Sequence, residues 1–300
     1  MWRSRRLRRV AGQLVFVAVV VTAVYVLWFN LVTNMRAFGQ RLDFSYLGES
    51  AGFRIGGTSF RSSQTILDGL LVGVKNTVTI SLLGIALALV LGVMIGISRL
   101  STNWLVARAA AVYVQAIRNI PLLAIIFFWY AAVILKLPRI TDAATFGPFL
   151  VSNRGVVISE SFTLRPEFLA LLAALVMYTA SHIAEIVRGS IQAVPRGATE
   201  AATALGLSPT KRLQLVVLPL ATRIALPQVV NQFLNLLKNS SLGIAVAYAE
   251  LMAVSQVSIA NGAPAPQTLA IVMAFYLAIS LLISGSVNLY DRRFVSGRLR

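Results

Sequence analysis

The residues best placed to do chemistry in this chain are polar side chains within an otherwise apolar segment around residue 230. Four of them recur at three- and four-residue spacing, which places them on one face of a helix: Gln228, Asn231, Asn235 and Lys238. Asn239 and Ser240 follow directly. A polar stripe with one cation suits a carboxylate passing through a water-lined pathway, and its candidate residues are Asn231, Asn235, Lys238, Asn239 and Ser240. Alternatively, Lys238 forms a structural ion pair or snorkels, and the amides bond between helices.

A second group of polar side chains lies at the end of another apolar segment. Glu185 and Arg188 are three residues apart, so they can form an ion pair along one helix face. We predict this structural pair, with Arg118 as another partner for the carboxylate; the alternative is that Glu185 meets a substrate ammonium group. We expect His182 to form a hydrogen bond between helices, and a proton relay is the second interpretation.

Several kinds of chemistry are excluded by what the chain lacks. It has no cysteine and a single histidine, which argues against a metal site. None of its four lysines, at positions 75, 136, 211 and 238, follows a glycine, so the chain has no GxxxxGK[ST] loop for ATP phosphates. Asp and Glu together number ten and lie mostly outside the apolar segments, so no constellation for an intramembrane enzyme is present. The sequence therefore predicts a chain that is not an enzyme and binds no cofactor itself.

Composition places these residues in a membrane. The chain is 57% hydrophobic and 12% charged, with a mean hydropathy of +0.78, whereas soluble domains are about a quarter charged. A helix needs about 20 predominantly apolar residues to cross a bilayer. Six segments qualify, at roughly 10–32, 74–98, 111–136, 167–187, 213–250 and 268–290. We predict an all-α membrane protein, a polytopic bundle of about six transmembrane helices.

Two of these segments contain prolines that alter a straight helix. The fifth segment contains Pro219 and Pro227 and is too long for one span, so we expect a helical approach from the cytosol followed by the span itself. Pro121 is expected to kink the third segment. The outer connections are expected to form short amphipathic pieces without a separate domain.

Basic residues decide the predicted orientation. They gather in segments 1–9, 99–110, 188–212 and 291–300, whereas the longer outer segments carry only Arg36, Arg41, Arg54, Arg61, Arg139 and Arg154. Because positively charged loops stay in the cytosol, we predict a multi-pass protein of a bacterial inner (plasma) membrane with both termini cytosolic. The first segment lacks a small-x-small cleavage site, which favours an uncleaved anchor over a signal peptide. The net charge of +17 is spread over these segments, so we expect no nucleic-acid partner.

The cytosolic segment between Glu185 and Pro219 has an unusual composition for a membrane-protein loop. Its alanine-rich part, 197–205, has high helix propensity. Gly206 can end that helix in the left-handed conformation, and Ser208 can cap a second helix with Pro209 at its first position. We predict two short helices joined by a glycine turn, with small side chains that let a partner protein approach. The alternative is an amphipathic hairpin on lipid headgroups.

The spacing in this loop resembles the EAA signature of ABC importer permeases. The pattern runs Glu200-Ala201-Ala202, three residues, Gly206, nine residues, Val216, one residue and Leu218-Pro219, with Val216 in place of the usual isoleucine. In that family the loop is the coupling helix that docks on a cytosolic ATPase. The resemblance therefore implies a set of ATPase-coupling residues: Glu200, Ala201, Ala202, Gly206, Leu218 and Pro219.

Other segments resemble the polar amino-acid (His/Met-type) branch of the same family. They are Asn76-Thr77 and the stretches 113–130, 182–197 and 235–245. A preceding span and the segment Ser152 to Gly155 are similar to the general L-amino-acid permease subfamily. The resemblance implies a type I ABC importer (MetI-like) core. It divides the chain into a basic tail, anchor and outer loop at 1–64 and a transmembrane domain at 65–300, with the coupling loop at about 188–219.

The resemblance also implies a mechanism and a set of partners. It implies a permease subunit that moves L-amino acids by alternating access, driven by a dimer of separate ATP-binding subunits that use ATP and Mg. A second, homologous but different permease chain, a periplasmic amino-acid-binding protein and the lipid bilayer complete the expected partners. The alternative is an ion-coupled secondary carrier or channel of six helices, which leaves the EAA spacing unexplained.

Overall fold

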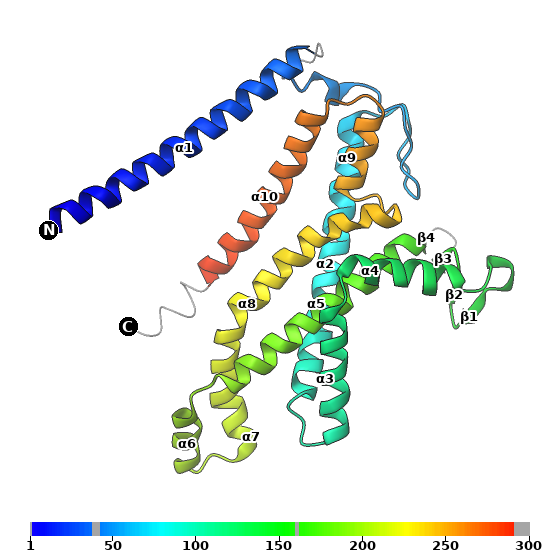
Figure 1. The fold of residues 1–300 in the computed structure, drawn as a ribbon. Coiled ribbons are helices and arrows are strands. Elements are labelled where there is room, and N and C mark those ends of the chain that lie inside the picture. The colour runs from blue at the N-terminus through cyan, green and yellow to red at the C-terminus, as the bar shows by residue number, and fades with distance from the viewer. Residues whose placement is uncertain (1, 38–42, 160–161, 291–300) are drawn as a thin grey trace.

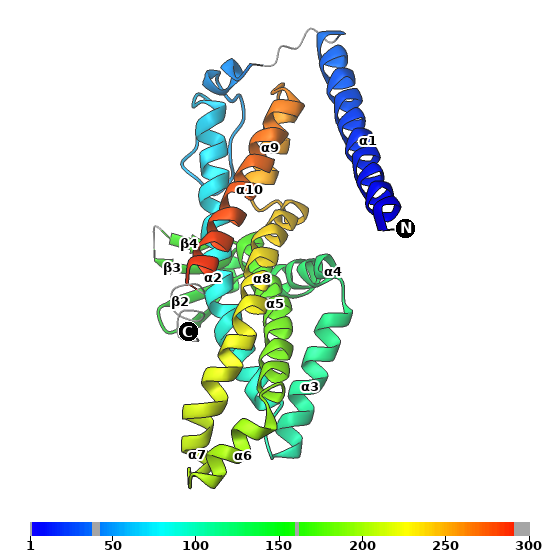
Figure 2. The same cartoon turned by 90° about the vertical axis from the view of Figure 1, so that its left-hand side faces the viewer.

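A long N-terminal helix and a bundle of shorter helices make up the structure. The computed structural model describes residues 2–37, 43–159 and 162–290, so the predicted cytosolic tail 291–300 and Arg41 lie outside the described residues. Helix α1, Trp2–Ala37, is longer than the predicted span 10–32. It lies apart from the other helices (Figure 1, Figure 2), and none of its most apolar stretch is buried against them. An apolar stretch that is not buried against the bundle is suited to lipid or to another chain.

The number of spans agrees with the prediction from hydropathy. Within the described residues, five helices are long and apolar enough to cross a membrane, and a bent pair raises the number to six. The helices of the bundle are α2 (Ile66–Ser98), α3 (Trp104–Asn119), α4 (Leu122–Phe127), α5 (Pro166–Gln192), α6 (Arg196–Ala204), α7 (Pro209–Arg212), α8 (Leu218–Asn239), α9 (Leu251–Ala260) and α10 (Ala265–Tyr290). Helix α2 begins at a capping box in which Thr65 and Asp68 bond each other's backbone N–H groups.

The third predicted span, 111–136, is not one kinked helix. Helix α3 begins seven residues earlier, where the Asn103 side chain accepts hydrogen bonds from Leu105 and Val106 N–H, and it ends at Asn119. The chain then turns by 106° before the next helical segment, Leu122–Lys136. Ile120 and Pro121 are extended at the break, with ψ of 131° and 135°. The residue before a proline avoids the helical region and proline donates no N–H, so the helix breaks where the sequence predicted a kink.

The fifth predicted span, 213–250, lies largely in one helical stretch of 38 residues, Pro209–Val246, in which no break separates an approach helix from the span. A π-helical turn at Leu213–Val217 joins α7 to α8, and a 3₁₀ helix at Ser240–Val246 follows α8. This 3₁₀ helix ends at Ala247, which has a left-handed φ of 58°. Beyond it, the buried Glu250 caps α9 by accepting hydrogen bonds from Met252 N–H at 2.8 Å and Ala253 N–H at 2.6 Å. The chain therefore turns at Ala247, between the 3₁₀ helix and α9.

Glycines let α2 and α5 pack closely at the centre of the bundle. A Cβ atom built on Gly96 would lie 2.8 Å from the Ala184 carbonyl oxygen, and one on Gly92 would lie 2.7 Å from the Ile183 Cβ. Small residues at membrane helix contacts allow such backbone approach. The buried cluster around this contact includes Ile80, Ala88, Leu171, Leu175, Ile183 and Leu236.

Replacing Gly96 by valine should therefore force α2 and α5 apart. Overpacking of this kind costs about 1–3 kcal/mol, so the detergent-purified protein should unfold at a lower temperature than the wild type. Gly285→Val is the matched control, because a Cβ on Gly285 of α10 would meet nothing within 4 Å. Equal loss of thermal stability in both variants would contradict the role assigned to the α2–α5 contact.

The outer segments are folded against the bundle or into a sheet. Residues 43–64 pack on the N-terminal end of α2 and on α9, where the Phe53 and Phe60 rings lie 5.7 Å apart in a second buried cluster. Residues 144–164 form an antiparallel meander of β1 (Ala144–Phe146), β2 (Phe149–Ser152), β3 (Gly155–Ser159) and β4 (Phe162–Leu164). Val151 pairs with Val156, so the segment Ser152 to Gly155 is the turn of a hairpin. The helical prediction thus holds for the membrane part, and the sheet adds an element that hydropathy did not reveal.

Candidate coupling elbow and polar cavity

The predicted loop helix is α6, and it ends in a defined turn. Gly206 has a φ of +74°, the left-handed conformation that glycine adopts without strain. Gly206 N–H donates to Thr203 O at 2.9 Å and Leu207 N–H donates to Ala202 O at 3.1 Å. These two bonds form a Schellman motif, which satisfies the last carbonyls of α6. The turn at Gly206 therefore has the conformation that its position in the sequence predicted.

A second set of contacts fixes α7 against α6. The Ser208 side chain accepts a hydrogen bond from Lys211 N–H at 3.4 Å, with Pro209 at the start of the helix. Arg212 Nη1 donates to Thr203 Oγ1 at 2.7 Å. We call residues 196–212 the coupling elbow. Because side-chain and backbone bonds join its two helices, it can act as one rigid unit.

Small side chains and one carboxylate are exposed on the surface of the coupling elbow. Glu200, Ala201 and Gly206 are exposed, whereas Ala202 is buried. Leu205 is 81% exposed, although it is a large apolar residue at the tip of the elbow. The sequence analysis did not select Leu205, because helix propensity alone does not say which way a side chain points. An exposed leucine beside small residues suits a protein contact.

The elbow leads back into the membrane through the predicted Leu218-Pro219 pair. Leu218 is the first residue of α8 and Pro219 the second, directly after the π-helical turn Leu213–Val217. Leu218 also lines an apolar cavity of about 220 Å³ between α2, α5 and α8. Movement of the elbow would therefore reach α8 directly through this short connection.

A polar cavity of about 540 Å³ lies between α3, α5 and α8, in the half of α5 that leads to the elbow. Its polar lining comprises Arg118, His182, Glu185, Ser190, Gln228, Asn231 and Gln232. The hydroxyl of Ser190 is buried and has no hydrogen-bond partner in the described part of the chain. Within that same part, no three acidic, histidine or cysteine side chains are grouped to hold a metal ion.

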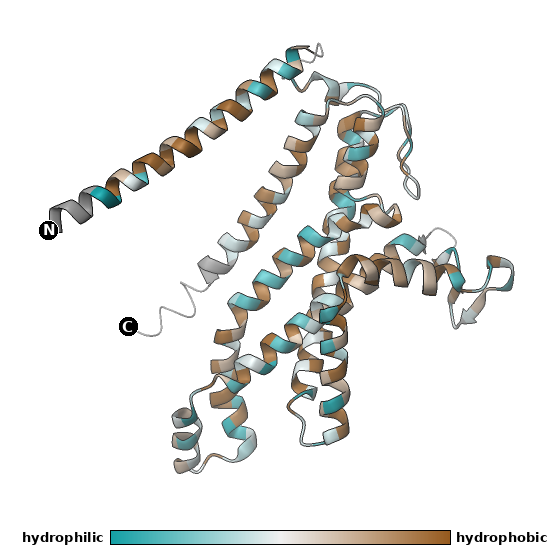
Figure 3. Ribbon diagram, in the orientation of Figure 1, coloured by the Kyte–Doolittle hydropathy of each residue, from teal (hydrophilic) through white to brown (hydrophobic). Residues whose placement is uncertain are grey.

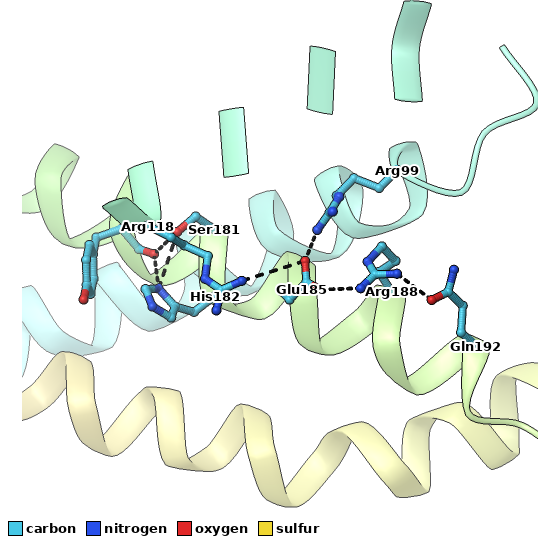
Figure 4. A network of polar contacts seen from close by, with 8 residues as sticks. Arg99, Arg118, Ser181, His182, Glu185, Arg188 and Gln192 are labelled. Atoms are coloured by element: carbon cyan, nitrogen blue, oxygen red, sulfur yellow. Dashed lines mark hydrogen bonds and ion pairs between the residues drawn. The ribbon is translucent and has the colours of Figure 1, made fainter. Parts of the chain in front are cut away.

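Glu185 is the centre of an ion cluster beside the cavity (Figure 4). Arg99 contacts Glu185 Oε2 and Arg188 contacts Oε1, while Arg118 Nη1 lies 3.9 Å from Oε2. The predicted pair with Arg188 is present, but Arg99 at the end of α2 was not selected from the sequence. Burial, together with Arg188 and Arg118, lowers the pKa of Arg99. The cluster connects the C-terminal end of α2, the C-terminal end of α3 and the C-terminal half of α5.

His182 is held within its own helix rather than between helices. Its Nδ1 lies 2.9 Å from the Tyr178 carbonyl oxygen, and the centroid of its ring lies 4.6 Å from that of the Tyr178 ring, at an interplanar angle of 45°. A carbonyl oxygen only accepts, so Nδ1 carries a proton in this contact, and Nε2 is an acceptor when the ring is neutral. The expected interhelical bond is therefore replaced by a bond one helical turn away.

The predicted pathway residues divide into two groups. Asn231 lines the cavity with Gln228, whereas Asn235 and Lys238 are exposed further along α8. The hydrophilic positions recur along α8 in Figure 3. Asn239 is half-buried, and the buried Ser240 donates its hydroxyl to Leu237 O at 2.7 Å. The structure thus brings Asn231 to the cavity and leaves Lys238 outside it.

Comparison with known proteins identifies the family. Residues 70–296 match the model of the binding-protein-dependent transport system inner membrane component. The chain belongs to this family of membrane transport components. As a member, this permease is an inner-membrane protein, and its coupling elbow lies within the matched region.

Curated relatives of the permease cover three quarters of its length or more. It is 33% identical to the general L-amino acid transport system permease protein AapQ of Rhizobium johnstonii, over 95% of this chain and 92% of the relative. It is 32% identical to the glutamine transport system permease protein GlnP of Escherichia coli, over 75% of this chain and 92% of the relative.

Solved structures support the fold of the permease. The crystal structure of an amino acid ABC transporter with histidines aligns with a TM-score of 0.63 at 23% identity, covering 76% of this chain and 95% of that chain. An inward-facing MetNI methionine ABC transporter aligns with a TM-score of 0.56 at 19% identity, covering 75% of this chain and 97% of that chain. These alignments are consistent with the predicted type I importer core.

Proposed function

We propose that this permease forms the membrane pathway of an ATP-driven importer for L-amino acids and relies on a separate ATPase. The observation that carries the proposal is the rigid coupling elbow with Glu200 and Leu205 exposed. Its small side chains leave room for the groove of an ATP-binding subunit. A dimer of such subunits binds ATP and Mg, and its closure moves the elbow and α8. The transport pathway then alternates between its inward-facing and outward-facing states.

The exposed polar face of α8 supports a second permease subunit. Asn231, Asn235 and Lys238 are exposed in a helix that crosses the membrane. A charged residue at the bilayer centre costs about 2.5–3.5 kcal/mol on insertion scales, so such residues face protein or water. A homologous, different permease chain would cover this face and enclose a pathway between the two subunits.

The substrate class rests on the relatives and on the cavity. The names of AapQ and GlnP refer to amino-acid and glutamine transport. A cavity of about 540 Å³ with charged and amide side chains can hold a molecule of that size. A periplasmic amino-acid-binding protein would deliver the substrate to the outer face. Both termini would be cytosolic, and residues 1–64 would precede a transmembrane domain at 65–300.

Reconstitution tests this function directly. The permease, its ATP-binding partner and a second permease chain are placed in proteoliposomes with the binding protein outside and ATP inside. Uptake of labelled amino acids should require ATP and the binding protein. Uptake that follows an ion gradient without the ATPase would instead support an ion-coupled carrier.

The role proposed for Lys238 predicts a change in transport rather than in folding. Lys238→Ala should lower uptake or substrate affinity at least about fivefold while the complex still assembles, because a cation is lost from the pathway face. Lys136→Ala, which removes an exposed lysine elsewhere, is the control. Unchanged uptake of every amino acid by the Lys238 variant would remove this residue from the pathway.

A further inference from the structure

The charges beside the polar cavity do not balance. Three guanidinium groups surround the single carboxylate of Glu185, and both of its oxygens are already engaged, Oε2 by Arg99 and Oε1 by Arg188. Arg118 lies 3.9 Å from Oε2, which Arg99 contacts more closely. Figure 4 shows Arg118 approaching Glu185 from the side opposite Arg188. Glu185 therefore has little capacity left to neutralise Arg118.

Arg118 is the cation of this cluster that is available to a ligand. Its side chain is 42% exposed, against 12% for Arg99 and 27% for Arg188. Of these three arginines, it is the one that lines the cavity. In the described part of the chain it reaches no carboxylate more closely than Glu185. A guanidinium group in this position can bind a carboxylate through two parallel hydrogen bonds.

The rest of the cavity offers uncharged donors and acceptors. The amide nitrogen of Gln228 donates to Ile224 O at 3.2 Å, which leaves its carbonyl oxygen as an acceptor. Asn231 and Gln232 add further amides. The Ser190 hydroxyl is buried and unpartnered within the described residues, and Nε2 of His182 is an acceptor when the ring is neutral. These acceptors suit the ammonium group of an amino acid, and a buried polar group without a partner favours a polar ligand.

We propose that Arg118 is a specificity-determining residue that binds a carboxylate of the transported amino acid and disfavours cationic side chains. The inference rests on the proposed function. A ligand with a net negative or neutral charge gains from the surplus guanidinium, whereas the side chain of arginine or lysine meets like charge without a free carboxylate to offset it. The permease should therefore bind acidic and amide amino acids in preference to basic ones.

Binding without the periplasmic protein tests this inference, because that protein imposes its own selectivity. The assembled permease–ATPase complex in nanodiscs is titrated with labelled L-glutamate, L-glutamine and L-arginine. Wild-type complex should bind the first two at least about tenfold more tightly than L-arginine. Arg118→Gln should weaken glutamate binding and bring the three affinities within about threefold, and Arg118→Lys should restore part of the preference.

The control is Arg108→Gln, which removes an exposed arginine from the same helix without touching the cavity lining. Size-exclusion chromatography checks that each variant remains in the complex.

If the complex imports amino acids but prefers L-arginine, or if Arg118→Gln leaves the preference unchanged, the inference is wrong and the proposed function stands. A change only in retained phosphatidylglycerol, measured by native mass spectrometry, would instead assign Arg118 to lipid binding. Absence of any ATP-dependent amino-acid uptake would refute the proposed function itself.

Discussion

Replacing Gly206 by proline should abolish ATP-dependent uptake while the permease still inserts into the membrane. Gly206 has a φ of +74°, whereas proline fixes φ near −65°. Proline also removes the N–H group that donates to Thr203 O at 2.9 Å. The turn that sets the direction of α7 from α6 would be lost at a cost of about 3 kcal/mol. Because Gly206 lies outside the candidate spans, the loss should affect docking and not insertion.

Two substitutions on the elbow surface separate docking from folding. Glu200→Lys reverses an exposed charge, and Leu205→Asp replaces an apolar side chain that is 81% exposed. If either residue is a hot spot worth about 2 kcal/mol, the ATPase should associate about thirtyfold more weakly. Uptake in proteoliposomes and co-purification of the ATPase measure the two effects.

The matched control for these variants is Gly197→Ala. Gly197 lies in α6 near its start, and an added Cβ would meet nothing within 4 Å. This variant should retain both uptake and ATPase binding. If each of the Gly206, Glu200 and Leu205 variants retains full transport, the elbow does not have the proposed coupling role.

Glu185→Gln is the second change with a large expected effect, because it removes the one carboxylate that three arginines share. Arg99, whose side chain is 12% exposed, would lose its closest anionic partner. Removing one partner of a partly buried ion pair costs about 1–3 kcal/mol, and more when the remaining charge is fully buried. The contacts that join α2, α3 and α5 around Glu185 should weaken, and the complex should unfold at a lower temperature.

A second substitution shows whether the loss comes from unbalanced charge. Glu185→Gln combined with Arg99→Gln should recover part of the lost stability, since the combination removes one of the repelling cations. Glu49→Gln, an exposed carboxylate far along the chain, is the control and should leave the unfolding temperature unchanged. A Glu185 variant as stable as this control would show that the cluster does not hold the helices together.

The ion cluster also connects the cavity with the coupling elbow. Glu185 lines the cavity and lies in α5, which ends at Gln192 four residues before α6 begins. A rigid helix between the two sites can transmit movement in either direction. Substitutions at Glu185 should therefore lower both amino-acid uptake and the unfolding temperature. Gly96→Val should mainly lower the unfolding temperature.

Local sequence determined the elements whose stability depends on neighbouring residues. The alanine-rich helix, the left-handed Gly206 and the Ser208 cap with Pro209 were all predictable, because each depends on contacts within a few residues. The number of spans followed from hydropathy for the same reason. The pair of Glu185 and Arg188 also lies within one helical turn.

Only the tertiary structure decided which distant residues meet. Arg99 is 86 positions from Glu185, and no spacing rule connects two helices across such a separation. The 106° break at Pro121 and the β-meander at 144–164 depend on what the surrounding chain packs against, so the sequence predicted one kinked span and short amphipathic outer pieces instead. Lys238 shares a helix face with Asn231, yet only Asn231 reaches the cavity. Periodicity gives the face of a helix, but packing against α3 and α5 determines which part of that face encloses a site.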